Sequence, residues 1–186
     1  MGILNVTPDS FFDGGEYKTV ETAVKRAIEM VEQGAKIVDV GGESTRPGSE
    51  EISIEEELDR VIPVIEAIRD QCDVNISIDT KKVEVAKNAI EAGAGMVNDV
   101  SGLINPNMVK LVSECEVYVV IMHMQGTPVD MQDKPQYDNV VNEIKNWLNE
   151  RVKNAINNGI KKDKIGVAIK YARLSLKKVS FSSNTS

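Results

Sequence analysis

The sequence predicts an α/β protein built on a parallel β-sheet covered by helices. Short apolar runs begin near residues 2, 36, 75, 96, 117 and 165, and segments with helical periodicity fill the gaps between them. Such regular alternation is typical of a parallel sheet. Five of the six runs end in a hydrogen-bonding side chain. The 186 residues, with 41% hydrophobic content, suffice for one domain with a core.

The first two strands are separated by a long loop and one helix. Gly2–Val6 is a short apolar strand, and Thr7–Gly15 is a loop rich in turn-forming residues. Apolar residues recur at helical spacing over Val20–Gly34, where the final glycine serves as the C-cap. The β-branched run Lys36–Val40 then predicts the second, buried strand.

The next helices are recognised by the residues that begin or end them. Ser53 and Glu56 form a capping box at the start of a helix, and Pro63 is expected to kink or break that helix. Asn75–Ile78 is the third strand. The helix Lys82–Ala92 follows it and stops at a glycine.

The last units follow the same pattern. The fourth strand begins at Met96, and Asn105 and Pro106 read as the N-cap and first residue of the next helix. The fifth strand is expected at Val117–Met122 and the sixth at Ile165–Ile169. The long amphipathic helix Val140–Asn158 lies between them.

Composition argues against several classes of protein. The net charge of −7 does not suit a surface that binds nucleic acid or an anionic membrane. Two cysteines, Cys72 and Cys115, and a single histidine argue against a disulfide framework and a zinc site. No apolar run approaches the roughly 20 residues of a membrane span. No secretory signal is recognised, so a cytoplasmic location is expected.

Polar residues at the strand ends predict the site. The ends carry Asn5, Asp39, Asp79, Asn98 with Asp99, and His123. Because the carboxyl ends of parallel strands face one rim in a barrel, we expect these side chains to meet in one pocket. Arg46, which follows the Gly41–Gly42 pair, would lie above it with a fork of donors suited to phosphate or carboxylate.

Each of these residues also has a structural interpretation. Asp79 is a candidate cap for the helix that begins near Lys81. Asp39 is better explained as a carboxylate that holds the Gly-Gly loop than as a direct ligand. Asp99 is a candidate acceptor for backbone amides in the Ser101–Gly102 turn. His123 is more often a packed residue than a base, and Met122 and Met124 fill the pocket or the core.

Several motifs resemble those of the dihydropteroate synthase family. The first is N-V-T-P-D-S-F-x-D-G-G at Asn5–Gly15, and the second is G-G-E-S-T-R-P-G at Gly41–Gly48. S-I-D-T at Ser77–Thr80, N-D-V-S-G at Asn98–Gly102 and M-H-M-Q-G-T-P at Met122–Pro128 extend the resemblance. It covers about residues 1–165 and implies a TIM (β/α)8-type barrel, here incomplete with about six βα units.

The resemblance implies a role for individual residues. Asp79 and Asn98, with Met122, would bind the pterin. Asn5 would contact the pyrophosphate and bind Mg²⁺, a cation that prefers oxygen ligands. Thr45 and Arg46 would close over the pyrophosphate and the aminobenzoate. Asp13 and the first loop would become ordered on substrate binding.

The reaction implied is that of folate biosynthesis. Family members join 4-aminobenzoate to (7,8-dihydropterin-6-yl)methyl diphosphate and release pyrophosphate, and they are sulfonamide targets. Departure of pyrophosphate would leave a methylene cation stabilised by the pterin, which the aniline nitrogen captures. Catalysis would then rest on charge stabilisation and on positioning of the nucleophile.

The sequence departs from the family pattern in its last part. Phe12 stands where a serine is usual, and Ala168-Ile169-Lys170 replaces a D-P-G motif. We therefore expect a truncated or frame-shifted version of the enzyme, with a partial pterin-binding barrel over 1–169 and a divergent, poorly ordered tail over 170–186. Six strands would leave open edges, so we expect marginal stability or an assembly, such as a homodimer, that covers them.

Two other functions are compatible with the same residues. One is a non-catalytic remnant that binds pterin through Asp79 and Asn98. The other is a pterin-dependent methyltransferase, which shares the barrel and the pterin site. The T-P-D-S-F and S-T-R-P-G loops favour the synthase, because in that family they serve pyrophosphate and aminobenzoate.

Overall fold

The structure is a computed structural model that describes residues 1–7, 16–44, 51–123 and 139–169. In these ranges strands and helices alternate along the chain. The elements in order are β1 (Gly2–Asn5), α1 (Glu16–Glu32), β2 (Ile37–Gly41), α2 (Ile54–Gln71), β3 (Asn75–Asp79), α3 (Val83–Glu91), β4 (Met96–Asp99), α4 (Pro106–Cys115), β5 (Tyr118–His123), α5 (Val140–Asn157), the short 3₁₀ helix η2 (Lys162–Lys164) and β6 (Ile165–Ile169).

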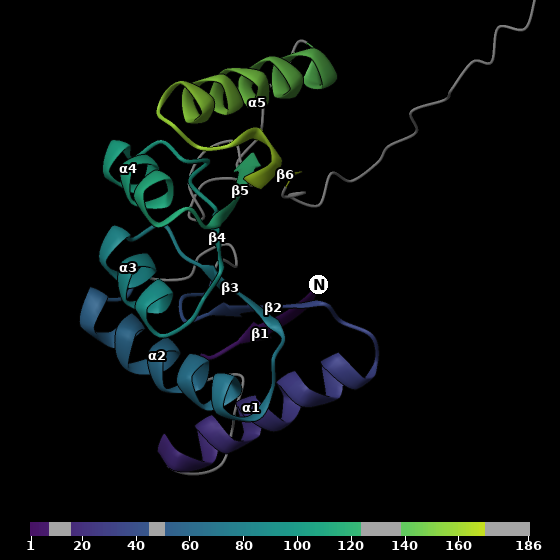
Figure 1. The fold of residues 1–186 in the computed structure, drawn as a ribbon, viewed down its shortest axis with the longest axis vertical. Coiled ribbons are helices and arrows are strands. Elements are labelled where there is room, and N and C mark those ends of the chain that lie inside the picture. The colour runs from purple at the N-terminus through teal and green to yellow at the C-terminus, as the bar shows by residue number, and fades with distance from the viewer. Residues whose placement is uncertain (8–15, 45–50, 124–138, 170–186) are drawn as a thin grey trace, which may run out of the picture.

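The six strands form one parallel sheet in chain order, β1 to β6. The sheet curves, and the helices lie along its outer side (Figure 1). Within the described ranges, β1 pairs only with β2 and β6 only with β5, so the strands form an open arc. The predicted α/β class, the strand alternation and the two open edges are therefore confirmed.

The core fills the space between the sheet and the helices. Side chains of successive strand residues point to opposite faces, so alternate positions face the helices. These positions hold aliphatic side chains that are almost fully buried, in particular Leu4, Val40, Ile78, Val97 and Val119. The opposite face is more open: Ile3 is 65% exposed and Tyr118 is 49% exposed. The open face is the one available to a ligand.

One helix boundary and the effect of one proline differ from the prediction. The helix expected from Val20 begins at Glu16. Pro63 lies inside α2, which stays continuous. Its ring is on the exposed side of the helix, where the lost backbone hydrogen bond can be replaced by water. The Ser53 cap is confirmed, since its Oγ accepts from the Glu56 N–H at 3.1 Å.

The turns after α1 and α3 share one geometry. Gly34 and Gly93 have positive φ values of 101° and 111°, which glycine adopts without strain. In each case the following residue, Ala35 or Ala94, donates its N–H back to a carbonyl in the last helical turn, at 2.9 and 2.8 Å. These turns lead the chain from each helix directly into the next strand.

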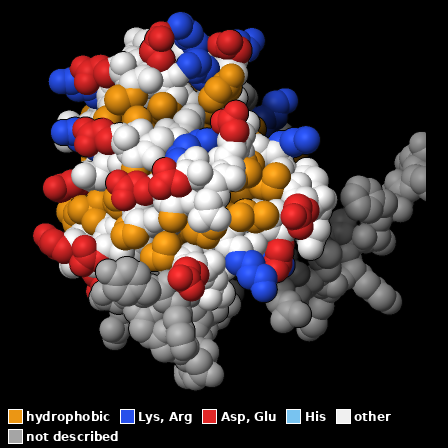
Figure 2. All heavy atoms as spheres, turned by 60° about the horizontal axis from the view of Figure 1, so that its bottom comes forward, with side chains coloured by type: hydrophobic (Ala, Val, Ile, Leu, Met, Phe, Trp, Pro, Cys, Tyr) orange, Lys and Arg blue, Asp and Glu red, His pale blue; other side chains and the backbone are white. Residues whose placement is uncertain are grey.

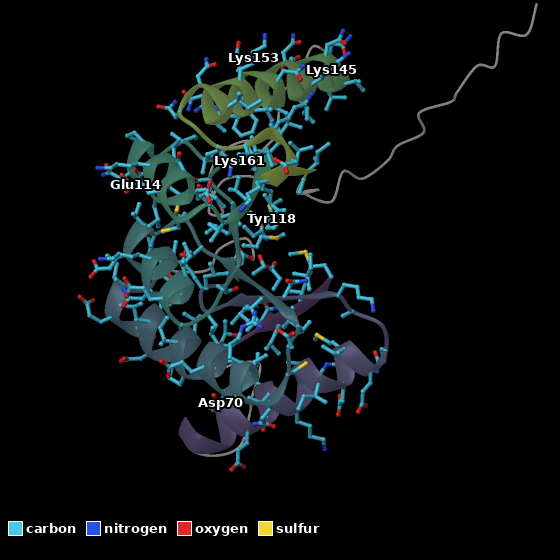
Figure 3. All side chains as sticks on the ribbon, viewed as in Figure 1. Asp70, Glu114, Tyr118, Lys145, Lys153 and Lys161 are labelled. Carbon is cyan, nitrogen blue, oxygen red and sulfur yellow. The ribbon has the colours of Figure 1, made fainter. Side chains whose placement is uncertain are left out.

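The surface carries charges of both signs. On the face that Figure 2 brings forward, acidic and basic side chains are interspersed with small hydrophobic groups. Lys145 and Lys153 lie on the side of α5 that is turned away from the sheet (Figure 3). Among the described residues, no helix combines the length and the apolar composition that a membrane span requires.

Candidate functional site

Three of the predicted site residues lie in one row across the open face of the sheet. Asn5 is in register with Gly41, Gly41 with Asp79, and Asp79 with Asn98. Residues in register on neighbouring parallel strands point to the same face. A Cβ at Gly41 would lie 3.5 Å from the Asp79 Cβ and 3.9 Å from the Asn5 Oδ1. Glycine therefore leaves the middle of the row without a side chain.

Asn98 is held by a buried carboxylate beneath the row. Its Nδ2 donates to Asp39 Oδ2 at 2.9 Å, and both residues are buried. Since a carboxylate can only accept, this bond orients the amide so that Oδ1 remains as an acceptor. That Oδ1 is buried and has no hydrogen-bond partner in the described part of the chain. Burial without a partner is costly, which favours a ligand N–H at this point.

Asp39 supports the site in a different way from the one predicted. Its observed partner is Asn98, whereas Arg60 is the residue that holds the Gly-Gly turn, donating from Nη1 to the Gly42 carbonyl at 2.8 Å. Burial raises the pKa of the Asp39 carboxyl, against the lowering effect of the polar neighbours Ser77 and Asn98. Asp39 is a residue that positions Asn98.

Asp79 is not the cap of the following helix. The cap residue of α3 is Lys82, which makes no side-chain cap bond. Just before it, Thr80 Oγ1 accepts from the Lys82 N–H at 3.1 Å. The half-buried Asp79 carboxylate instead lies next to Asn98 on the open face, so the two residues present oxygen acceptors side by side.

The prediction that all polar side chains at the strand ends lie in one pocket is wrong for Asp99 and His123. Each is one residue beyond an open-face position, so it points toward the helices. Asp99 Oδ1 accepts from the Ser101 N–H at 2.7 Å, and its Oδ2 accepts from the Leu103 N–H at 3.1 Å. The predicted structural role of Asp99 in this turn is therefore confirmed.

His123 packs against α5. Its ring lies edge-on to Trp147 with centroids 4.9 Å apart, and Arg151 stacks over the same indole at 5.6 Å. His123 is 7% exposed. Burial lowers the pKa of His123 below its ordinary value of 6.5, and a backbone hydrogen bond works in the other direction. The structural interpretation of this histidine thus agrees with the packing.

The lowered pKa of His123 predicts that the stability of the fold depends on pH. Because its pKa is lower in the folded state, the unfolded chain binds more protons, and stability falls as pH drops below about 6.5. We expect this loss to be absent in His123→Gln. Since the chain has one histidine, proton NMR of its imidazole gives the pKa directly. A value at or above 6.5 in the folded protein would contradict the packing described.

A cluster of ion pairs beside the row was not predicted. Lys82 Nζ lies 2.6 Å from both Glu43 Oε2 and Glu57 Oε2. Burial acts to lower the pKa of Lys82, but the two glutamates outweigh it and raise that pKa. One signal was available in the sequence. Glu57 lies four residues before Val61 on the buried face of α2, where a charged residue needs a partner.

The other predicted site residues divide into two groups. Met122 is half-buried on β5, at a position that faces the same side as Asn98. Asp13, Thr45 and Arg46 lie outside the described residues, as does the tail 170–186. In the described ranges, no group of three or more His, Cys, Asp or Glu side chains is arranged to hold a metal ion.

Comparison with known proteins identifies relatives of this chain. The dihydropteroate synthase of Escherichia coli K12 is 48% identical over 165 residues, which is 89% of this chain and 58% of that protein. A structure of Xanthomonas albilineans dihydropteroate synthase with 4-aminobenzoic acid matches at a TM-score of 0.82. It is 48% identical and covers 90% of this chain and 59% of the other.

A Yersinia pestis dihydropteroate synthase with a sulfonamide drug complex matches at a TM-score of 0.84. It is 42% identical and covers 92% of this chain and 62% of the other. The chain thus spans about three fifths of the length of these relatives. The pterin binding enzyme family matches residues 1–169, which include every strand described above. The chain belongs to the pterin-binding enzyme family, and its relatives within that family are dihydropteroate synthases.

Proposed function

We propose that this chain carries the pterin and diphosphate site of a dihydropteroate synthase. The reaction condenses 4-aminobenzoate with (7,8-dihydropterin-6-yl)methyl diphosphate to give 7,8-dihydropteroate and pyrophosphate. The observation that carries the proposal is the pair of neighbouring acceptors on the open face, Asp79 and the partnerless Asn98 Oδ1. The aminopyrimidinone edge of a pterin offers adjacent N–H donors, which match such a pair.

The charge and orientation of these acceptors fit a pterin. A hydrogen bond to an ionised carboxylate is stronger than one between neutral groups, so Asp79 would supply most of the affinity. Asn98, fixed by Asp39, would set the direction of the ring. Met122 on the neighbouring strand would contact the ring as an apolar surface. The methylene carbon would then face the rim, where the diphosphate must leave.

The remaining roles are proposals that follow from the family. Asn5 is exposed at the end of the row and offers its amide oxygen as a ligand. One neutral oxygen does not form a metal cage, but it fits a Mg²⁺ ion that arrives on the substrate diphosphate. Such an ion would neutralise charge on the leaving group. Thr45 and Arg46 would bind the pyrophosphate and the aminobenzoate, and Asp13 would help to cover the site.

The chemical step needs little from the protein beyond placement. The bond from the methylene carbon to the diphosphate oxygen breaks, and its electron pair leaves with pyrophosphate. The aniline nitrogen then forms a bond to that carbon and loses a proton to solvent. Arg46 would stabilise the departing charge, and the bound pterin would hold the carbon near the amine. A sulfonamide would compete for the aminobenzoate position. A cytoplasmic location and a homodimer paired through the open edges remain predictions.

The proposal is tested by pyrophosphate release from the dihydropterin diphosphate on the full chain. We expect release that depends on 4-aminobenzoate and that a sulfonamide inhibits. Heat of pterin binding without release would limit the chain to a binding role. Absence of any pterin binding would contradict the proposal.

A further inference from the structure

Three buried polar side chains lie on the same side of β2, β3 and β4 as the row of site residues. Asp39 is in register with Ser77 of the neighbouring strand, and its Oδ2 accepts from Asn98 Nδ2 across that strand at 2.9 Å. Asp39 is 4% exposed, Ser77 0% and Asn98 5%. Because water is largely excluded here, the hydrogen bond between Asp39 and Asn98 is stronger and more restrictive than one at the surface.

The carboxyl group of Asp39 favours one orientation of the Asn98 amide. Nδ2 donates to Oδ2, whereas the flipped amide would place Oδ1 against Oδ2, so that two acceptors would face each other. In a buried site such a contact is costly, since no water can separate the two oxygens. Asn98 therefore presents an acceptor, and not a donor, to a ligand that binds beside it.

This orientation does not depend on the protonation state of Asp39. Burial raises the pKa of its carboxyl, while Ser77 and Asn98 act to lower it. The proton of the neutral form belongs on Oδ1, because Oδ2 already accepts from Asn98 and Oδ1 has no hydrogen-bond partner in the described part of the chain. Oδ2 therefore remains an acceptor in both states.

The neighbouring acceptor, Asp79, defines where the amino group of a pterin would lie. A carboxylate accepts two parallel N–H groups, and the ring N3–H and one hydrogen of the 2-amino group form such a pair. The second hydrogen of that amino group would then point along the row. In one direction lies Gly41, which has no side chain, and in the other lies Asn98, in register with Asp79 on the adjacent strand. Asn98 Oδ1 is thus the acceptor suited to this hydrogen.

We infer that Asp39 determines the specificity of the site for the 2-amino group of the pterin. It is a positioning residue, because it acts through the Asn98 amide and touches no ligand. This inference rests on the proposed function, which places the amino edge of a pterin at Asp79 and Asn98. It predicts discrimination against a lumazine, the analogue whose C2 oxygen replaces the amino group and would face two acceptors.

The test compares two ligands on the full chain by calorimetry, 6-hydroxymethyl-7,8-dihydropterin and the corresponding lumazine. Asp39→Asn keeps the size of the side chain, but an amide at this position can donate to Asn98 as well as accept from it. Asn98 can then turn its Nδ2 toward the C2 oxygen of the lumazine. We expect the ratio of the two affinities, which favours the pterin in the wild type, to fall about tenfold.

Asp99→Asn is the matched control. Asp99 is also buried, but it lies on the helix-covered side of β4, where it accepts from the N–H groups of Ser101 and Leu103. The same exchange there should lower the urea midpoint of unfolding and leave the ratio of affinities within about twofold of the wild type. Because burial already disfavours the charged form of Asp39, the neutral Asp39→Asn chain is expected to fold. Asp39→Ser, whose hydroxyl also donates and accepts, should give the same fall in the ratio.

A double-mutant cycle shows whether Asp39 acts through Asn98. Asn98→Ala removes the acceptor and should itself lower the ratio of affinities. In that background, Asp39→Asn should change the ratio by less than about twofold, because the amide that Asp39 orients is gone. A further tenfold fall would mean that Asp39 influences the ligand by another route, and the inference would be wrong.

The outcomes separate this inference from the proposed function. A wild-type chain that binds neither ligand overturns both. A wild-type chain that binds the pterin but does not prefer it to the lumazine overturns the inference alone, as does an unchanged ratio in Asp39→Asn. Equal losses for both ligands, together with a lower urea midpoint, would show that Asp39 only stabilises the fold.

Discussion

Asp79→Asn is expected to weaken pterin binding about 10- to 100-fold, since hydrogen bonds to a charged group contribute about 1.5–3 kcal/mol. The substitution keeps the size of the side chain but removes the charge and replaces one acceptor oxygen with a donor. A donor facing the N–H edge of a pterin is repelled by it. Asn98 remains in place next to the changed side chain. Calorimetric titration with 6-hydroxymethyl-7,8-dihydropterin measures the effect.

Asp70→Asn provides the control for this experiment. Asp70 is exposed near the end of α2 (Figure 3). It precedes β3, whereas Asp79 is the last residue of that strand, so the length of the strand separates the two carboxylates. The same chemical change there should leave the affinity unaltered. Equal affinity in Asp79→Asn and Asp70→Asn would mean that the pterin does not use the open face at β3.

Lys82→Met is expected to destabilise the fold by about 3–5 kcal/mol, because it leaves the Glu57 carboxylate buried without its cation. Methionine is similar in length and apolar, so little packing is lost. The chain should unfold at a markedly lower urea concentration than the wild type. Equilibrium unfolding in urea, followed by circular dichroism, measures the difference.

Two variants separate charge from packing in this cluster. Lys81→Met removes a neighbouring lysine that is 31% exposed, and we expect a loss of less than about 1 kcal/mol. Lys82→Met/Glu57→Leu removes both charges of the buried pair and should recover much of the stability lost in the single variant. If the double variant were as unstable as Lys82→Met, the unpaired Glu57 charge would not be the cause.

The order of elements could be predicted from the sequence because each one carries a local pattern. On β2, Val38 and Val40 share the helix-covered face while Asp39 between them lies on the other, and Gly34 and Gly93 end their helices through positive φ values. Pro63 was the exception. Whether a proline disrupts a helix depends on which side of the helix it occupies, and a single sequence does not fix that side.

The candidate site was predicted in part. Asn5, Asp79 and Asn98 share a face, whereas Asp99 and His123 point the other way. One residue of shift reverses the face in a strand, and the exact register is known only once the strands are paired. Polar strand ends therefore showed which edge of the sheet matters but did not show which side chains meet there.

The contacts that position the site could not be predicted from spacing. Lys82, which lies between β3 and α3, contacts Glu43 and Glu57 of the preceding β2–α2 unit. Asp39 of β2 contacts Asn98 of β4 across the intervening strand β3. Such contacts depend on tertiary packing, and the sequence shows only the residues that need a partner. A glutamate on the buried face of α2 and an aspartate in a buried strand were the two signs available.

A crystal structure of the chain with bound 6-hydroxymethyl-7,8-dihydropterin tests the assignment of the open face most directly. We expect the amino edge of the ring at about 2.7–3.2 Å from the Asp79 carboxylate and from Asn98 Oδ1. The Asn98 amide should still donate to Asp39. A ring bound on the helix-covered side, beside Asp99 or His123, would contradict this assignment.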